Sequence, residues 1–153
     1  MVEKFAALMT TFPLFQGFTS QGAQRLIEPG EIKTYGAGEA LFAEGEEPTF
    51  VALVLAGNIA VFVERDGAEM PLTDVGAGAI LGELAVLCGM PRAASVRAKD
   101  AATVLQWDAA PFRNLLLRYP LVSERIFKES LRTLVEKERA LINSIAAARG
   151  QAR

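Results

Sequence analysis

The sequence predicts a mainly β fold with flanking helices, and the distribution of its glycines is the first reason. Ten of the thirteen glycines lie between Gly30 and Gly89, where they separate short apolar runs. Two clear examples of these runs are Thr49–Leu55 and Ile59–Val63. Because regular turn signals between short apolar strands are typical of a sandwich or a barrel, we expect a β domain over residues 29–108.

A hairpin signal and two later runs support the same fold class. Asp66-Gly67 stands between the run that ends at Val63 and a second run, Glu69–Leu72, which is typical of a tight two-residue turn. Further along the chain, Ala93–Arg97 and Thr103–Trp107 read as two more strands. These strands complete the expected β section.

Helical patterns precede the β section. Residues 1–9 carry apolar side chains at helical spacing. A second helix is expected to begin near Thr19 or Ser20, either of which can act as the cap, and to run through Leu26. We therefore expect N-terminal helices over residues 1–28.

More helix follows the β section. Asp108 is well placed to cap a helix over Ala109–Arg118, with Pro111 tolerated in the first turn, and Tyr119-Pro120 should break that helix. A long helix is then expected from Leu121 to about Ala148. The sequence thus predicts C-terminal helices over residues 109–148 of a single domain, 1–153.

The expected long helix carries an apolar stripe at near-heptad spacing, in which Glu138 takes one apolar slot. The stripe residues are Phe127, Leu131, Leu134, Leu141 and Ile145. It either packs on the barrel or forms a seam between two subunits. The helix is longer than the barrel can cover, which favours the seam.

Composition narrows the classes of protein. A chain of 153 residues can bury a core without a disulfide, and its single cysteine, Cys88, fits a reducing compartment. No apolar run approaches the roughly 20 residues of a membrane span, and no secretory signal begins the chain, so we expect a cytoplasmic protein. A net charge of −2 argues against nucleic-acid binding, and the absence of histidine argues against His triads and His metal sites.

The stretch Ile80–Ser95 concentrates the residues that suit a sugar phosphate. Gly82 lets the backbone approach a ligand, and the amides that follow it would be donors at the start of a short helix, where anions bind. Pro91 fixes the backbone before Arg92, whose planar fork can bind a phosphate through two hydrogen bonds. The Glu83 carboxylate is an acceptor and suits a ribose hydroxyl. The alternative is an ordinary strand-turn-helix with an exposed surface arginine.

These residues carry a resemblance to a known family. Gly82-Glu83-Leu84-Ala85, followed after a variable span by Pro91-Arg92-Ala93-Ala94, resembles the phosphate-binding cassette of cyclic nucleotide-binding domains in kinase regulatory subunits, catabolite activator proteins and gated channels. Pro13–Phe18, Gly36–Gly45 and Gly57 also look like landmarks of that family. The resemblance implies an eight-stranded antiparallel β-roll, a double-stranded β-helix of jelly-roll type, with N-terminal helices and a long C-terminal helix.

The resemblance also implies roles for the cassette, residues 82–95. Arg92 would hold the exocyclic phosphate oxygens. Glu83 and the Gly82 amide would take the ribose 2'-hydroxyl, and the amides of Ala85 and Ala93 would complete the phosphate cradle. The candidate residues of the cassette are Gly82, Glu83, Leu84, Ala85, Arg92, Ala93 and Ala94.

The nucleotide base is expected to meet apolar residues. By the same resemblance, Val61, Leu72 and Val75 would line the floor under the purine, although β-core packing explains them as well. In the family, a Thr after the cassette arginine accompanies cGMP preference; this chain has Ala93 there, which resembles the cAMP type. By resemblance to the catabolite activator, the base-contacting positions of the long helix would fall on Leu134 and Val135, which are apolar here and suit a lid.

We therefore expect a cyclic nucleotide sensor, for cAMP before cGMP, that signals through its C-terminal helix to an effector protein or to its own dimer. An enzyme of the cupin type is an alternative, but such sites use mostly His ligands, so we expect no catalysis, metal or cofactor. A structural or interaction module without the ligand is a second alternative, which the presence of both Glu83 and Arg92 disfavours. Only residues 150–153 follow the expected helix, so we expect no DNA-reading segment and no membrane partner.

Overall fold

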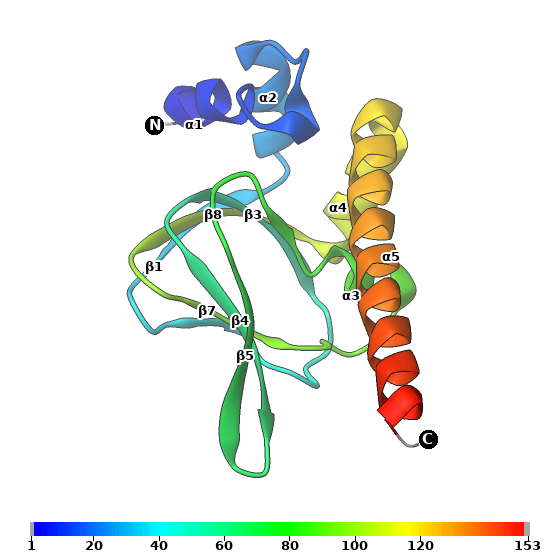
Figure 1. Cartoon of the computed structure of the whole chain (residues 1–153). Coiled ribbons are helices and arrows are strands. Elements are labelled where there is room, and N and C mark those ends of the chain that lie inside the picture. Colours follow the sequence, from blue (N-terminus) through cyan, green and yellow to red (C-terminus); the bar gives the residue numbers. More distant parts are fainter. Residues whose placement is uncertain (1, 152–153) are drawn as a thin grey trace. The chain divides into compact units, whose positions relative to one another are not determined.

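Two four-stranded antiparallel sheets form a β-roll in the computed structural model, which describes residues 2–151 (Figure 1). The first sheet has the order β1-β8-β3-β6, and the second has the order β2-β7-β4-β5. The strands are β1 (Glu31–Tyr35), β2 (Ala40–Phe42), β3 (Phe50–Ala56), β4 (Ile59–Arg65), β5 (Ala68–Val75), β6 (Ile80–Leu81), β7 (Ser95–Ala98) and β8 (Ala102–Asp108). The predicted fold class is confirmed, with strand limits shifted by up to three residues.

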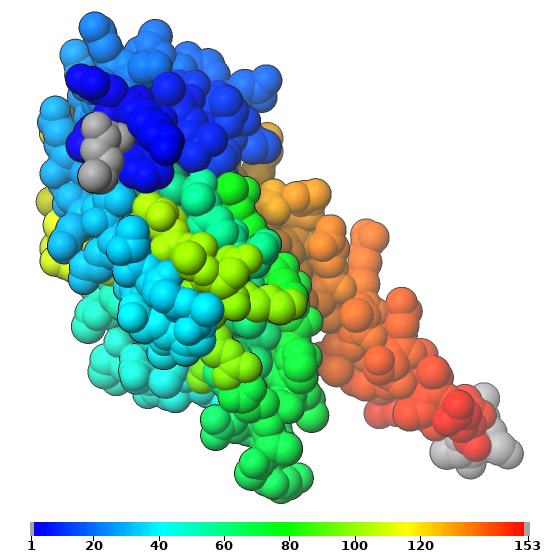
Figure 2. Space-filling view, turned by 90° about the vertical axis from the view of Figure 1, so that its left-hand side faces the viewer, coloured from blue at the N-terminus to red at the C-terminus, as the bar shows by residue number. Residues whose placement is uncertain are grey.

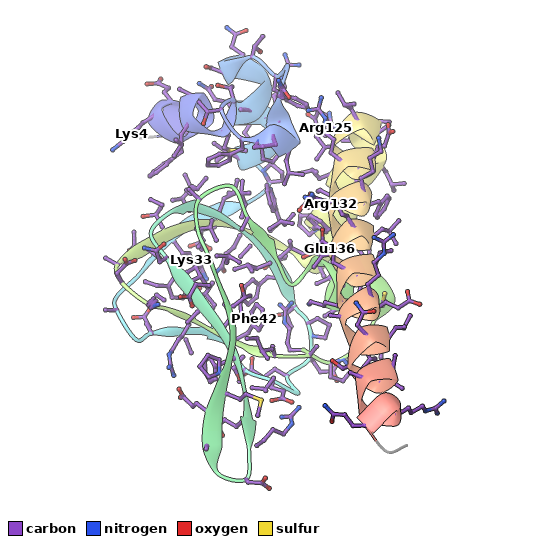
Figure 3. The ribbon with its side chains drawn as sticks, in the orientation of Figure 1. Lys4, Lys33, Phe42, Arg125, Arg132 and Glu136 are labelled. Atoms are coloured by element: carbon purple, nitrogen blue, oxygen red, sulfur yellow. The ribbon has the colours of Figure 1, made fainter. Side chains whose placement is uncertain are left out.

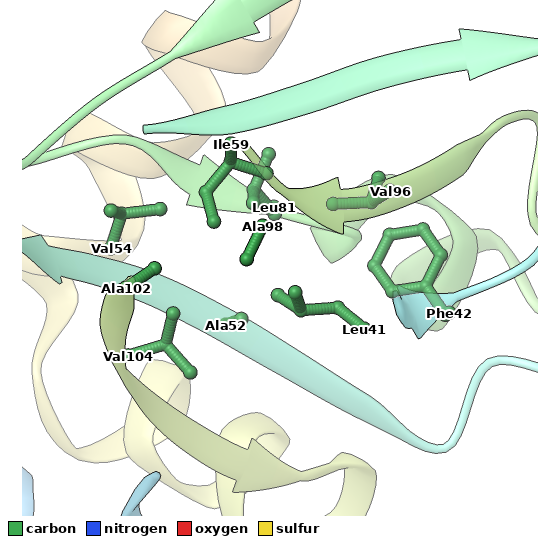
Figure 4. Packing of buried hydrophobic residues seen from close by; sticks show 10 residues of the cluster. All are labelled: Leu41, Phe42, Ala52, Val54, Ile59, Leu81, Val96, Ala98, Ala102 and Val104. Atoms are coloured by element: carbon green, nitrogen blue, oxygen red, sulfur yellow. The ribbon is translucent and has the colours of Figure 1, made fainter. Parts of the chain in front are cut away.

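A core of aliphatic side chains and one aromatic ring fills the space between the two sheets (Figure 4). Small residues such as Ala52 and Ala98 stand beside Ile59 and Leu81 there. Tyr35, at the end of β1, packs against this core and accepts a hydrogen bond from Nε2 of the buried Gln106. Each sheet therefore turns alternate residues of its strands toward the inside of the roll.

The first sheet is buried on its other face as well. Side chains of β8 alternate, so Val104 faces the inside of the roll while Trp107 lies on the opposite face. Nε1 of Trp107 donates to the carbonyl oxygen of Leu26 at 2.8 Å, and its ring centroid lies 6.0 Å from that of Phe112. On this face α1 (Val2–Met9) contacts β3, and α4 (Ala109–Arg118) contacts β3 and β8. The 3-10 turn η1 (Pro13–Phe15) connects α1 to α2 (Ser20–Ile27), and Leu26 of α2 accepts the Trp107 bond.

The helix limits agree with most of the sequence signals. The Thr19 hydroxyl accepts a hydrogen bond from the Gly22 amide at 3.0 Å, which confirms the predicted cap of α2. The chain leaves α4 after Arg118 and enters α5 (Pro120–Gln151) at Pro120, so the expected break is confirmed. Asp108 is the last residue of β8, and its capping role stays a prediction.

The hairpin between β4 and β5 has the predicted two-residue turn. Asp66 and Gly67 both take positive φ angles, 55° and 78°, as a type I′ turn requires. The hairpin projects beyond the rest of the roll in Figures 1 and 2. The strand expected over 69–72 is longer, because β5 is an edge strand that accommodates Pro71.

The chain divides into two compact units, one that ends at Arg118 and one that begins at Tyr119. The second unit is α5, a helix of 32 residues along which Figure 3 labels Arg125, Arg132 and Glu136. It continues three residues beyond the predicted end at Ala148, because a glycine near a helix end costs only about 1 kcal/mol in propensity. Among residues 2–151, none of the helices combines the length and the hydropathy that a bilayer crossing needs.

Candidate functional site

Gly82 is the turning point of the cassette. It follows β6 and caps α3 (Glu83–Cys88) in the left-handed conformation, with φ 78° and ψ 9°. A Cβ atom on this residue would lie far inside 3.0 Å of Nη1 of Arg92, a separation that real Cβ atoms do not show. Glycine is therefore required here for two reasons: it allows the left-handed backbone angle, and it leaves room for the Arg92 side chain.

Arg92 is buried, with only 3 % of its surface exposed, so the alternative of an exposed surface arginine is wrong. Its Nη1 donates to the carbonyl oxygen of Gly82 at 2.9 Å, and its Nη2 donates to the carbonyl oxygen of Phe50 at 2.6 Å. Its Nε is also buried but has no hydrogen-bond partner. Among the side chains that the structure describes, it is the one buried polar atom in this state. A buried donor left unpaired costs about 1 to 3 kcal/mol, and more when the group is charged.

The electrostatics of Arg92 favour an anion. Burial lowers the pKa of its guanidinium, while the nearby carboxylates of Glu46 and Glu83 act in the opposite direction. A guanidinium keeps its charge in proteins, because its pKa lies far above physiological pH. The cassette thus holds a buried cation with a donor that points at no protein acceptor.

Two aromatic rings lie against the guanidinium. Cζ of Arg92 is 4.0 Å from the ring centroid of Phe42 and 5.1 Å from that of Phe50. Figure 3 shows Phe42 within the roll. The sequence analysis missed both residues, because an aromatic residue in a strand looks like ordinary core.

Reciprocal backbone hydrogen bonds connect the loop after β2 to the cassette. The Arg92 amide donates to the carbonyl oxygen of Glu46 at 2.9 Å, and the Gly45 amide donates to the carbonyl oxygen of Arg92 at 2.8 Å. The Glu44 amide donates to Oγ of Ser95 at 2.9 Å. These three bonds fix the backbone at Arg92, and the sequence analysis assigned no such role to Glu46 or Ser95.

The other cassette residues lie where the sequence places them. Glu83 and Leu84 are the first two residues of α3, and Ala85 is the third. Amides in the first turn of a helix have no acceptor within that helix. Ala93 and Ala94 connect Arg92 to β7. The structure therefore brings the two halves of the cassette motif together around the Arg92 side chain.

The residues that we expected to contact the nucleotide base fall into three groups in the structure. Val61 and Val75 are half-buried and pack against the core of the roll. Leu72 is 55 % exposed and falls at the irregularity between β4 and β5, so the structure does not bring it to that core. Leu134 and Val135 are neighbours on α5, in the second unit, with 43 % and 46 % of their surfaces exposed.

Metal ligands do not gather in the part of the chain that the structure describes. No group of three or more His, Cys, Asp or Glu side chains within residues 2–151 is arranged to hold a metal ion. The single cysteine, Cys88, is exposed at the end of α3.

Known proteins resemble the chain across this site. A cAMP-dependent protein kinase regulatory subunit from Blastocladiella emersonii is 32% identical over 119 residues, which cover 77% of this chain and 30% of that protein. A type II regulatory subunit from Drosophila melanogaster is 27% identical over 115 residues, which cover 74% of this chain and 30% of that protein. The chain therefore spans under a third of the length of these relatives.

Solved structures share the fold. The catabolite activator protein of Thermus thermophilus has a TM-score of 0.77 and 26% identity, covering 84% of this chain and 61% of that one. A cyclic nucleotide-binding-like protein from Brucella abortus has a TM-score of 0.61 and 29% identity, covering 74% of this chain and 97% of that one. The family model for the cyclic nucleotide-binding domain matches residues 32–119, a segment that contains Gly82, Arg92 and all eight strands except the first residue of β1. The chain therefore belongs to the family of cyclic nucleotide-binding domains.

Proposed function

We propose that this domain is a regulatory sensor that binds a cyclic nucleotide, with cAMP preferred over cGMP. The observation that carries the proposal is the unpaired Nε of the buried Arg92, beside the left-handed Gly82. A cyclic phosphate supplies the acceptor that this donor lacks. The proposal therefore rests on a buried charge that the protein alone leaves incompletely bonded.

Arg92 has enough donors left to hold two phosphate oxygens. A guanidinium carries five N–H groups, and the carbonyl oxygens of Gly82 and Phe50 use one on each Nη. The Nε–H and a remaining Nη–H lie in one plane and match a pair of phosphate oxygens. The exocyclic oxygens of a cyclic phosphate would accept both bonds.

The remaining cassette residues complete the site in this proposal. Glu83 and the Gly82 amide take the ribose 2'-hydroxyl, and Glu83 also contributes to the electrostatic stabilisation of Arg92. The amides of Ala85 and Ala93 donate to phosphate oxygens. Leu84 and Ala94 are placed by the same short helix and turn, so they shape the cradle through their backbone.

Apolar residues receive the base. Val61 and Val75 provide a floor, and the more exposed Leu72 provides part of the rim. Ala93 offers no hydroxyl to a guanine amino group, which is our reason for preferring cAMP. An apolar floor gives affinity and little discrimination, so we expect cGMP to bind more weakly and still measurably.

The output passes through α5 in this proposal. Leu134 and Val135 close over the base, and the exposed apolar residues Leu131, Leu141 and Ile145 provide a seam for a second subunit or an effector protein. A lid that contacts the nucleotide only when it is bound gives the ligand a differential affinity for one state. The relatives are named regulatory subunits, which supports a regulatory role. We also propose that the domain has no catalytic activity and acts in the cytoplasm.

Calorimetric titration of protein stripped of nucleotide tests the proposal. We expect micromolar or tighter binding of cAMP, weaker binding of cGMP and much weaker binding of adenosine, which has no phosphate. Arg92→Ala should weaken cAMP binding by about 2 to 4 kcal/mol, since it removes a charge-assisted fork. Arg97→Ala is the matched control, because Arg97 is a half-buried arginine outside the cassette that is already bonded to Glu69. If cAMP produced no heat and no thermal shift, the module would have kept the fold without the ligand.

A further inference from the structure

The rings of Phe42 and Phe50 form the surroundings of Arg92, and neither belongs to the cassette motif. The two rings meet edge to face, with centroids 6.0 Å apart and an interplanar angle of 69°. Phe42 is 7 % exposed, and a Cβ atom placed on Gly82 would lie 3.4 Å from Cε2 of its ring. A cation within about 6 Å of a ring centroid is attracted by the ring, and more strongly when water is excluded. Both distances to Cζ of Arg92 fall inside that limit.

We propose that Phe42 and Phe50 are positioning residues that fix the guanidinium plane of Arg92 so that its Nε–H is presented to the ligand phosphate. The inference rests on the proposed function, because it takes an anionic phosphate as the ligand. It goes beyond that function by assigning the orientation of the fork to two residues outside the cassette.

The contacts around Arg92 restrict the orientation of its guanidinium. The carbonyl oxygens of Gly82 and Phe50 accept from Nη1 and Nη2, and such acceptors fix the group within its own plane. The Phe42 ring, the closer of the two, opposes a tilt out of that plane. Phe50 acts twice, through its carbonyl oxygen and through its ring. Nε, on the remaining edge, has no hydrogen-bond partner among the described residues, so an acceptor on the ligand would complete its bonding.

A fixed fork changes what the site can distinguish. An arginine side chain that is ordered before the ligand arrives does not lose its rotamer freedom on binding, so more of the interaction appears as affinity. If the guanidinium has a fixed orientation, its free N–H groups point in a fixed direction. They would then bond one exocyclic oxygen of a cyclic phosphate more strongly than the other. The rings should therefore set both affinity for the phosphate and selectivity between its oxygens.

The chain contains a matched control for this arrangement. Cζ of Arg97 lies 4.3 Å from the ring centroid of Phe62, which is 9 % exposed. Arg97 already bonds both carboxylate oxygens of Glu69, at 2.6 and 2.7 Å. Phe62→Leu therefore removes a buried ring from beneath an arginine outside the cassette, as Phe42→Leu does within it.

The first test uses the full chain without nucleotide, so its result does not depend on the ligand. Nuclear magnetic resonance of labelled arginine should show the Arg92 Nε–H proton displaced by ring currents and slow rotation about the Nε–Cζ bond. Phe42→Leu should move that proton toward the position of a free arginine and speed the rotation. Phe62→Leu should leave the Arg92 signals in place. Arg92 signals that stay the same in Phe42→Leu would overturn the inference.

The second test uses cAMP and its two phosphorothioate diastereomers, in which sulfur replaces one or the other exocyclic oxygen. Phe42→Leu should weaken cAMP binding by roughly three- to thirtyfold and bring the affinity ratio of the two diastereomers toward one. Phe42→Trp should restore the ratio, because it restores the ring face. Thermal denaturation checks that each variant is folded, and Phe50→Leu replaces Phe42→Leu if the latter is not.

The outcomes separate this inference from the proposed function. An unchanged diastereomer ratio in Phe42→Leu, or an equal loss in Phe62→Leu, assigns Phe42 to core packing and overturns the inference alone. A wild-type protein that binds none of the three ligands refutes the proposed function instead, and the ligand-free resonance measurement still decides whether the rings orient Arg92.

Discussion

Gly82 and Arg92 lie so close together that a Cβ atom on residue 82 would clash with Nη1 of Arg92. Gly82→Ala should therefore displace the Arg92 fork and also strain the backbone, since φ is 78°. We expect at least a tenfold loss of cAMP affinity together with a loss of roughly 1 to 2 kcal/mol in the free energy of unfolding.

Gly89→Ala is the control for the backbone part of that effect. Gly89 ends the same helix with φ 65°, and a Cβ atom there would meet nothing within 4 Å. It should lose similar stability and keep its affinity for cAMP. Equal loss of affinity in both variants, measured by calorimetry, would show that the shape of α3 and not the space for Arg92 decides binding.

Glu83→Ala should weaken cAMP binding less than Arg92→Ala does, because it removes one hydrogen bond to the ribose and leaves the phosphate fork. The affinity for 2'-deoxy-cAMP should change little in this variant, since that analogue has no 2'-hydroxyl to bind. Titrations of both nucleotides with wild type and variant measure the difference. Equal losses for the two nucleotides would show that Glu83 acts through Arg92 and not on the ribose.

Leu134 and Val135 have a matched pair one heptad later in α5, Leu141 and Ile142, which are also exposed. If the first pair closes over the base, changing both of its residues to Ser should lower cAMP affinity by tenfold or more. The same change in the second pair should leave affinity intact and shift any dimer toward monomer. Calorimetry measures the cAMP affinity of both double variants, and sedimentation measures their oligomeric state. If the two double variants bound cAMP with equal affinity, a lid at Leu134 and Val135 would be ruled out.

Asp100 links stability to pH. Hydrogen bonds from the side chain and the backbone amide of Asn58 hold the pKa of its carboxyl below the usual 3.8. A lowered folded-state pKa means that the contribution to stability is complete above the unfolded-state value and is lost as the pH falls through the folded-state value. The melting temperature of wild type should exceed that of Asp100→Ala near pH 7, and the difference should shrink below about pH 4. A constant difference down to pH 3 would contradict this assignment.

Local patterns in the sequence were enough to predict much of the fold. Glycine spacing, the Asp66-Gly67 turn and the Thr19 cap act within a few residues, so the sequence shows them directly. The irregularity at Leu72 was not predicted, because register depends on the partner strand β4. The end of α5 was misplaced because the propensity of a single glycine near a helix end is a weak signal.

The candidate site also has parts that local sequence predicts and parts that depend on residues distant in the chain. The cassette motif is visible in the sequence because its residues are close together along the chain, and Gly82 and Arg92 are in contact in the structure. The inward orientation of Arg92 depends on Phe50, which is 42 positions away, and on Phe42, which belongs to another strand. Contacts of that range arise only when the two sheets close into the roll, so no local pattern indicates them.

We propose that the unpaired Nε–H of Arg92 binds the phosphate of a cyclic nucleotide. The most direct measurement is the resonance of that N–H group in nucleotide-free protein during titration with cAMP and, separately, with adenosine. We predict a large downfield shift of the proton and slower exchange with water for cAMP alone, because a new charge-assisted bond forms. An Arg92 Nε–H signal that stays in place at saturating cAMP would contradict the account.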